Sequence, residues 1–460
     1  MRLNMKQNNP FLLFKICLIT GVLFCFTAKT FAFVPDKKKL SQFTGDLNDD
    51  GFTDIVVAYT TNYSNSFGTV NVFFGNRNGI DTIAGWTYNC TQENFLTSPV
   101  YVSIINDVNG DCIDELCIML TNLSNGKSGR SHQDIFLFYG NKEGFGNNRL
   151  VMKLETEKKD KNSLRDYLAF DYDQDGFTDL LVIASERHYQ ALETSWFDVN
   201  KRLLLYHGSA TGINPAYETI KNISALYDLD FRDAGDVNGD GMNDMQILSL
   251  HKGTVTYSQL LTNKNHSIIT KPFLSYDLPG ATSNDKIYPS TTVWDLNGDK
   301  FDDALIMHED RTSFWHSKQD SARFTLDFYA GSSDGLRDSA VYTWKIATSF
   351  DSGLNITPCG DLNNDGYGDL ILKRFSENPK APGIKANIIW GSKDGLKLDE
   401  TPGFNQLFNS LDWVKKGYYH IDGLGDINGD GFGDLLLTGD TVAYGSKEGT
   451  FGLVQLKSRD

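Results

Sequence analysis

The sequence has little cysteine, no long apolar run beyond its N-terminus and no helical periodicity. There are 6 Cys among 460 residues, too few for a fold held together mainly by disulfides. Apolar residues do not recur at the spacing of amphipathic helices, which excludes an all-α fold. No later segment approaches the roughly 20 apolar residues of a membrane-spanning helix. The eight His are scattered, and none forms a His-Glu-x-x-His zinc motif.

Basic residues are also in the minority. The chain has 43 Lys and Arg against 59 Asp and Glu, a formal charge of −16, which disfavours nucleic acid as a partner. Its 40% hydrophobic and 12% aromatic content is typical of a folded protein. Because 460 residues exceed the usual size of one compact core, we expect several domains or a repeat array.

Residues 1–32 have the pattern of a secretory signal peptide. Arg2, Lys6 and Lys15 precede the apolar run Ile16–Phe26, and Thr30–Ala32 places small residues at a cleavage site. A membrane anchor is the alternative, but the run is shorter than a bilayer requires. We therefore expect a mature chain from residue 33 that is secreted, periplasmic or on the cell surface, with no transmembrane segment.

Four cysteines remain in the expected mature chain: Cys90, Cys112, Cys117 and Cys359. Export permits disulfides, and Cys90 could pair with Cys112 or with Cys117. Buried free thiols are the alternative, and the sequence leaves both open.

A nine-residue acidic loop recurs seven times, as in Asp426-Ile-Asn-Gly-Asp-Gly-Phe-Gly-Asp434. Loops 1 to 7 begin at Asp46, Asp107, Asp171, Asp236, Asp295, Asp361 and Asp426, so that successive starts are 59 to 66 residues apart. One such loop would be an ordinary solvated turn. Seven in register mark a repeat architecture.

The spacing within each loop suits Ca²⁺, which takes six to eight hard oxygen ligands. Side-chain oxygens stand at positions 1, 3, 5 and 9, position 6 is usually Gly, and position 7 offers a carbonyl. Together the loops hold 22 carboxylates, more than a third of all the acids. We expect up to seven structural Ca²⁺, with these ligands: Asp46, Asn48, Asp50, Phe52 and Asp54; Asp107, Asn109, Asp111, Ile113 and Glu115; Asp171, Asp173, Asp175, Phe177 and Asp179; Asp236, Asn238, Asp240, Met242 and Asp244; Asp295, Asn297, Asp299, Phe301 and Asp303; Asp361, Asn363, Asp365, Tyr367 and Asp369; Asp426, Asn428, Asp430, Phe432 and Asp434.

Each repeat unit predicts four antiparallel strands. One strand enters the loop, a second leaves it, a third ends at a Gly-x-x-x-Gly turn in every unit except the fourth, and a fourth closes the unit. Seven such units predict an all-β fold, a seven-bladed β-propeller over residues 33–460, in which radial repetition protects the strand edges. The expected blades are roughly residues 39–100, 101–165, 166–230, 231–288, 289–354, 355–419 and 420–460.

These loops, with the Phe-Phe-Gly, Phe-Tyr-Gly and Trp-Gly strand endings, resemble the FG-GAP (VCBS-type) repeats of the integrin α-subunit propeller. The resemblance covers residues 39–460. It implies a seven-bladed propeller with structural Ca²⁺ in the first hairpin of its blades. It also implies a role in cell adhesion, or in protein or carbohydrate binding outside the cell.

Two of the seven loops depart from the common loop sequence. Loop 2 has Cys112 at position 6 and Glu115 at position 9, and loop 5 has Lys300 at position 6, so we expect these two to bind metal most weakly.

An EF-hand needs Glu at position 12, but every loop has an apolar residue there. The Gly-x-Ser-x-Gly at Gly331–Gly335 matches a hydrolase motif, but it is a repeat turn that contains Ser, so no catalytic residue is assigned.

Two classes of function remain. The first is a secreted or surface binding protein with an extracellular protein or glycan ligand. The second is an extracellular polysaccharide lyase or glycoside hydrolase acting from the central funnel of the propeller. For ligand binding we select Tyr189, Trp196, Arg311 and Trp315, which stand in two long connections between second and third strands, about Ser185–Arg202 and His308–Arg323. Aromatic residues with Arg are typical of binding hot spots. The alternative is that these aromatics only fold the connections onto the propeller.

Overall fold

The structure is a computed structural model. It describes residues 32–33, 38–61, 67–90, 99–123, 131–142, 149–153, 162–190, 195–222, 229–242, 244–251, 254–261, 269–277, 290–310, 323–347, 354–376, 383–394, 396–398, 421–437, 441–447 and 452–457. These residues form antiparallel sheets and contain no α-helix. The predicted all-β class is confirmed.

The N-terminal half contains four sheets, each named here by its order in the chain. Sheet 1 has five strands in the order β1-β2-β3-β4-β7, and sheets 2 to 4 have four each. Their strands are β1 (Ala32–Phe33), β2 (Lys38–Gly45), β3 (Asp54–Thr61), β4 (Phe67–Phe73) and β7 (Trp86–Asn89); β8 (Pro99–Ile105), β9 (Glu115–Leu123), β10 (Ser131–Phe138) and β11 (Arg149–Lys153); β12 (Asn162–Phe170), β13 (Asp179–Gln190), β14 (Ser195–Tyr206) and β15 (Tyr217–Asn222); β16 (Leu229–Gly235), β17 (Asp244–His251), β18 (Thr254–Leu261) and β19 (Ile269–Asp277).

The C-terminal half contains sheets 5 to 7, with the same meander of four strands in chain order. A two-stranded ribbon, β5 (Gly75–Asn76) with β6 (Gly79–Ile80), lies between β4 and β7 in the chain. The strands of sheets 5 to 7 are β20 (Ser290–Trp294), β21 (Asp303–Asp310), β22 (Arg323–Tyr329) and β23 (Tyr342–Ala347); β24 (Leu354–Gly360), β25 (Asp369–Ser376), β26 (Gly383–Trp390) and β27 (Lys397–Leu398); β28 (Ile421–Gly425), β29 (Asp434–Leu437), β30 (Thr441–Tyr444) and β31 (Gly452–Gln455).

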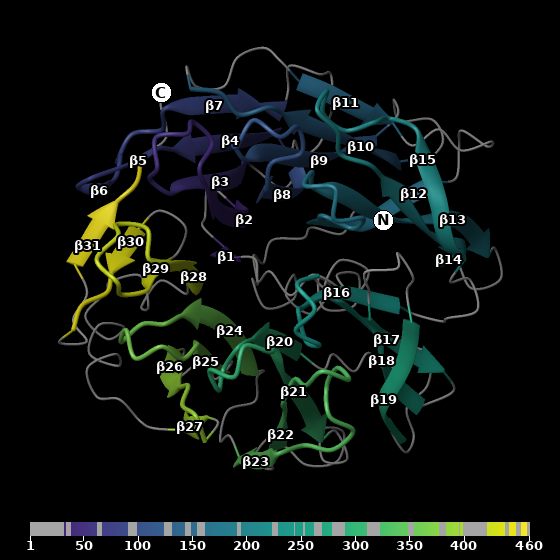
Figure 1. The fold of residues 1–460 in the computed structure, drawn as a ribbon, viewed down its shortest axis with the longest axis vertical. Helices are drawn as coiled ribbons and strands as arrows, with labels where there is room; N and C mark the ends of the chain where they lie inside the picture. Colours follow the sequence, from purple (N-terminus) through teal and green to yellow (C-terminus); the bar gives the residue numbers. More distant parts are fainter. Residues whose placement is uncertain are drawn as a thin grey trace, which may run out of the picture.

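The sheets follow one another around a centre, with their first strands innermost and their last strands outermost (Figure 1). First strands of several neighbouring sheets are in contact, as β2 is with β8 and β24 is with β28. The last sheet lies beside the first, because β28 also contacts β2 and the backbone N–H of Ala84 donates to Lys457 at 3.1 Å. The two ends of the described chain therefore pack against each other.

The core lies between the faces of neighbouring sheets. Second strands are buried on both faces, as in Leu435, Leu436 and Leu437, because each sheet has a neighbour on each side. Separate apolar clusters join sheets 1 and 2, sheets 2 and 3, and sheets 5 and 6. A further cluster joins sheet 1 to sheet 7 through residues such as Ile55 and Leu436. The apolar run after each acidic loop is thus explained by burial between two sheets.

The structure also shows the state of the cysteines, the place of the N-terminal strand β1 and the absence of a membrane-spanning helix among the described residues. Cys90, Cys117 and Cys359 are buried free thiols and Cys112 is an exposed one, so the disulfide alternative is not found. In β1, Ala32 and Phe33 pair with Lys39 and Lys38 of β2. The strand β1 therefore lies at the inner edge of sheet 1, next to β2. No helix among the described residues has the length and apolarity to cross a membrane.

Candidate metal centres in the acidic loops

The seven acidic loops share one backbone conformation. The position-1 carboxylate closes each loop, because its Oδ2 accepts from the position-6 N–H at 2.7–3.0 Å. Its Oδ1 accepts from the position-5 N–H at 3.0–3.3 Å. The position-5 carboxylate in turn accepts from the position-7 N–H at 2.9–3.1 Å. These bonds hold the side chains of positions 1 and 5 over the concave side of the loop.

Two residues of each loop are in the left-handed region. The expected one is position 6, where φ is positive even for Cys112 (67°) and Lys300 (72°). The other is position 4, with φ of 55° at Asp49 and 57° at Gln174. Position 4 is Gly, Asn or Asp in six of the seven loops, which are the residues that tolerate this conformation. That bias was available in the sequence as a signal for a second tight turn.

The position-9 carboxylate is buried in every loop and links distant backbone segments. One oxygen accepts from the position-2 N–H at 2.8–3.1 Å. In five sheets the other accepts, at 2.8–3.0 Å, from the first Gly of the Gly-x-x-x-Gly turn. Those glycines are Gly75, Gly208, Gly331, Gly391 and Gly445. Position 9 therefore ties the loop to the end of the third strand.

Burial raises the pKa of these position-9 acids. The pKa of Asp54, Asp303, Asp369 and Asp434 is raised to about 7, mainly by burial and to a smaller extent by the carboxylates at positions 1 and 5, although the backbone hydrogen bonds oppose the shift. The same causes raise the pKa of Glu115 to about 9. A buried carboxylate among like charges favours either a proton or a neighbouring cation. The site chemistry is thus suited to a divalent ion.

In loop 2, a buried carboxylate oxygen without a hydrogen-bond partner indicates whether the residues fit a cation. Glu115 is fully buried, and its Oε2 accepts from Val108, while its Oε1 has no hydrogen-bond partner. Oxygens of Asp107, Asp111 and Glu115 lie within 4.8 Å of one another. A buried carboxylate oxygen without a donor is costly, and a bound cation would satisfy it. The donor set of loop 2 therefore fits Ca²⁺, although this loop departs from the common sequence.

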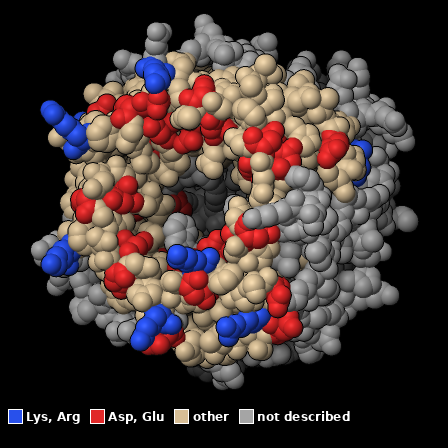
Figure 2. Space-filling view, viewed as in Figure 1, with Lys and Arg blue, Asp and Glu red and all other residues tan. Residues whose placement is uncertain are grey.

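Among the described residues, five pairs of neighbouring loops are hydrogen-bonded to each other along one face of the molecule. In these pairs the position-8 N–H donates to the position-1 carbonyl of the preceding loop, as from Asp114 to Asp46 at 3.0 Å and from Gly433 to Asp361 at 2.8 Å. The Asp114 carboxylate also accepts from the Asp46 N–H at 2.8 Å. Acidic side chains gather in clusters around a central hollow on the face shown in Figure 2. The acidic loops therefore also contribute to the contacts between neighbouring sheets.

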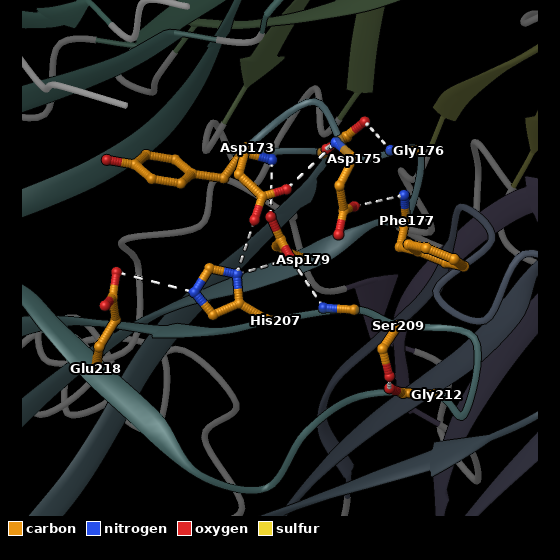
Figure 3. Close-up of polar contacts among 12 residues, drawn as sticks. Asp173, Asp175, Gly176, Phe177, Asp179, His207, Ser209, Gly212 and Glu218 are labelled. Carbon is orange, nitrogen blue, oxygen red and sulfur yellow. Dashed lines mark hydrogen bonds and ion pairs between the residues drawn. The ribbon is translucent and has the colours of Figure 1, made fainter. Parts of the chain in front are cut away.

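Loop 3 differs from the others in its side chains (Figure 3). Asp173 is the only acid at position 3, where the other six loops have Asn. His207, the residue before Gly208, places Nδ1 3.3 Å from Asp173 and 3.5 Å from the position-9 Asp179. Its Nε2 lies 3.8 Å from Glu218 on β15. Sequence reasoning missed His207, although it stands where the other turns have Phe74, Tyr139, Ala330, Trp390 and Tyr444.

The ligand residues predicted from the sequence are only partly within the described chain. Arg311 and Trp315 lie outside the described residues. Tyr189 and Trp196 lie on β13 and β14 and pair with each other in the antiparallel register. The segment predicted as a long connection in repeat 3 is therefore largely a hairpin of two long strands, and the loop interpretation was wrong there.

Comparison with known proteins gives a distant sequence match. No family model matches the chain. A stretch of 211 residues, 44% of this chain, is 25% identical to integrin alpha-PS2 of Drosophila melanogaster. The match spans 14% of the length of that protein.

Similar solved structures include a lectin and a rhamnogalacturonan lyase. The fold resembles an Aleuria aurantia lectin in complex with alpha-methyl-L-fucoside, with a TM-score of 0.37, 8% identity, and coverage of 81% of this chain and 99% of the lectin. It also resembles the rhamnogalacturonan lyase PL11 of Bacillus licheniformis, with a TM-score of 0.41, 12% identity, and coverage of 92% of this chain and 66% of the lyase.

Proposed function

We propose that this chain is a secreted or cell-surface β-propeller of seven blades, stabilised by Ca²⁺, that binds an extracellular protein or glycan. The blades follow the residue ranges given above, after a signal peptide of residues 1–32. The contact between sheets 1 and 7 supports the closure of the propeller. The distant match to an integrin α-subunit supports an adhesion-type role.

The observation that carries the calcium part is the shared construction of the seven loops. In each, backbone N–H groups fix the carboxylates of positions 1 and 5, and the buried position-9 acid lies beside them. Without a cation, each loop crowds three or four carboxylates together, and their repulsion disfavours the folded hairpin. When bound, Ca²⁺ would supply the positive charge, with the residues of positions 1, 3, 5, 7 and 9 as its ligands.

Thermal unfolding tests this part. Ca²⁺ that binds only the folded state stabilises it by about 2.7 kcal/mol per site at a hundredfold excess over the dissociation constant. EDTA should therefore lower the melting temperature, and Ca²⁺ should restore it more effectively than Mg²⁺. Identical melting curves in EDTA and in Ca²⁺ would contradict a structural role for the metal.

Screening with and without Ca²⁺ tests the binding part. The purified chain is applied to glycan and extracellular-protein arrays, and hits that disappear in EDTA and return with Ca²⁺ support a binding module that depends on the folded propeller. The same protein is incubated with a panel of polysaccharides. Turnover of any of them would replace the binding function with an enzymatic one.

A further inference from the structure

Loop 3 differs from the other loops in the charge around position 3. In loops 1, 2, 6 and 7 the Asn amide at position 3 donates to the position-5 carboxylate at 3.0–3.1 Å. In loops 4 and 5 it lies 3.3–3.4 Å from the position-9 carboxylate. Asp173 has no such amide and adds a negative charge instead. Loop 3 therefore has one more acid and one fewer donor than its six counterparts.

His207 lies at the place where that donor is missing. Figure 3 shows its ring between the carboxylates of Asp173 and Asp179 on one side and Glu218 on the other. Side-chain atoms of Asp173, Asp179 and His207 lie within 4.8 Å of one another. The extra acid and the imidazole are each unique to this repeat, and they face each other. The six other repeats serve as internal controls for this pairing.

We propose that loop 3 binds a divalent transition-metal ion such as Zn²⁺, with Asp173, Asp179 and His207 as its protein ligands. The inference rests on the proposed metal-binding role of the loops and makes loop 3 an exception to their calcium preference. Imidazole nitrogen suits Zn²⁺ and similar ions, whereas Ca²⁺ takes oxygen ligands.

The distances around His207 agree with this ligand set. Two ligands of a tetrahedral Zn²⁺ at bond lengths of about 2.0–2.1 Å are about 3.3–3.4 Å apart. Nδ1 lies 3.3 Å and 3.5 Å from the two carboxylate oxygens. A direct hydrogen bond from an imidazolium to a carboxylate would be shorter, at about 2.7–2.9 Å. The two distances from Nδ1 thus match the separation of atoms that share one ion.

The surroundings of the three ligands are also suited to a metal. Glu218 lies 3.8 Å from Nε2, on the side of the ring away from the two aspartates (Figure 3). Asp179 is fixed by the N–H groups of Tyr172 and Gly208. The side chain of His207 is 37% exposed, so solvent and ions can reach the ring.

Cobalt spectroscopy of the full chain tests the proposal. The protein is stripped of metal, saturated with Ca²⁺ so that the other loops are filled, and titrated with Co²⁺ and then with Zn²⁺. We expect one equivalent of Co²⁺ with the strong visible absorption of a low-coordinate site with a nitrogen ligand, and its loss when Zn²⁺ is added. Glu218→Gln removes a negative charge 3.8 Å from Nε2 and should weaken Co²⁺ binding.

Two variants remove the ligands, and a third serves as the control. His207→Phe gives repeat 3 the residue that repeat 1 has at Phe74, and Asp173→Asn gives loop 3 the common residue. Each should abolish the Co²⁺ absorption while Ca²⁺ still raises the melting temperature. Asn48→Asp gives loop 1 the acids of loop 3 without an imidazole, and it should create no such absorption.

The outcomes separate this inference from the proposed function. Absorption that is absent from the wild type, or unchanged in His207→Phe, would overturn the metal site. If the absorption is absent and His207→Phe also lowers the melting temperature, His207 acts as a protonated donor to Asp173 in place of a metal. Failure of Ca²⁺ to stabilise any variant would instead overturn the calcium proposal, independently of the cobalt result.

Discussion

The Oδ1 atom of Asp434 accepts a 2.8 Å hydrogen bond from the backbone N–H of Gly445. Its Oδ2 accepts from Ile427 at 3.0 Å, so that one buried side chain joins the acidic loop to the turn after the third strand. This bridge recurs in five sheets and gives the position-9 acid a structural role separate from metal binding.

Replacing that acid should destabilise the fold even without metal. Asp434→Ala leaves two buried N–H groups without acceptors, at a cost of about 1–3 kcal/mol each. Asp430→Ala removes an exposed carboxylate from the same loop and should cost less than about 1 kcal/mol in EDTA. Urea unfolding in EDTA measures both. Equal losses would show that Asp434 acts only as a metal ligand.

The metal-free chain should lose stability as the pH rises from about 4 to about 7. Burial raises the pKa of Asp54, Asp303, Asp369 and Asp434 to about 7, above the value of about 4 in an unfolded chain. The folded state binds more protons over this range, so its stabilising protonation is lost as the pH increases. Melting in EDTA at pH 5 and pH 7.5 measures this, with the same scans in saturating Ca²⁺ as the control. A flat EDTA profile, or a rising one, contradicts the assignment.

Much of the loop chemistry could be predicted from the sequence because it is local. Each acid at position 1 bonds N–H groups four and five residues away, so the spacing alone defines the turn. The contact between His207 and Asp173 could not be predicted in that way. It depends on where the third strand returns beside the loop, and His207 differs in type from the residues at its place in the other turns. The wrong interpretation of Ser185–Arg202 arose for a similar reason, because the pairing of β13 with β14 depends on a partner strand and the segment shows no regular apolar alternation.

Replacing Lys300 by glycine should stabilise loop 5 and strengthen its Ca²⁺ binding. Lys300 adopts φ of 72° at position 6, a conformation that costs a non-Gly residue about 1 kcal/mol or more. Lys300→Gly should therefore stabilise the chain by about 1 kcal/mol and strengthen Ca²⁺ binding by removing a cation. The matched change Gly51→Lys in loop 1, where an added Cβ would meet nothing within 4 Å, should do the opposite. Calorimetric titration and thermal melts measure both.

The strain at position 6 also predicts the relative Ca²⁺ affinity of the loops. Asp430→Ala in loop 7 should reduce the Ca²⁺-dependent rise in melting temperature more than Asp299→Ala in loop 5, because loop 7 has Gly431 at position 6. The reverse order would contradict the ranking. Loop 2 was ranked with loop 5 as weak, but the unpartnered oxygen of Glu115 is a reason for it to gain more from a cation than its sequence indicates.

A buried lysine between sheets 6 and 7 gives an independent pH test. Lys373 on β25 is fully buried and donates to the carbonyl of Ile421 on β28 at 3.3 Å. Burial lowers its pKa to about 8, although Asp422 opposes the shift. Between that value and about 10.4 the unfolded chain binds more protons, so the wild type should gain stability as the pH rises. Lys373→Met should be as stable as the wild type or more so at pH 7, and should lack that gain. Parallel slopes for the two proteins between pH 8 and pH 10 would show that Lys373 does not titrate differently on folding.

The hairpin of β13 and β14 contains two of the residues selected from the sequence for ligand binding. The register pairs Tyr189 with Trp196. If this pair contributes to ligand binding, Trp196→Ala should weaken the affinity for a ligand identified on the arrays at least about tenfold, as hot-spot aromatics do, with little change in melting temperature. Tyr342→Ala, which removes an exposed aromatic residue from β23 of sheet 5, is the control and should leave the affinity unchanged. Unchanged affinity in Trp196→Ala together with a lower melting temperature would show that the aromatic pair only holds the hairpin in place.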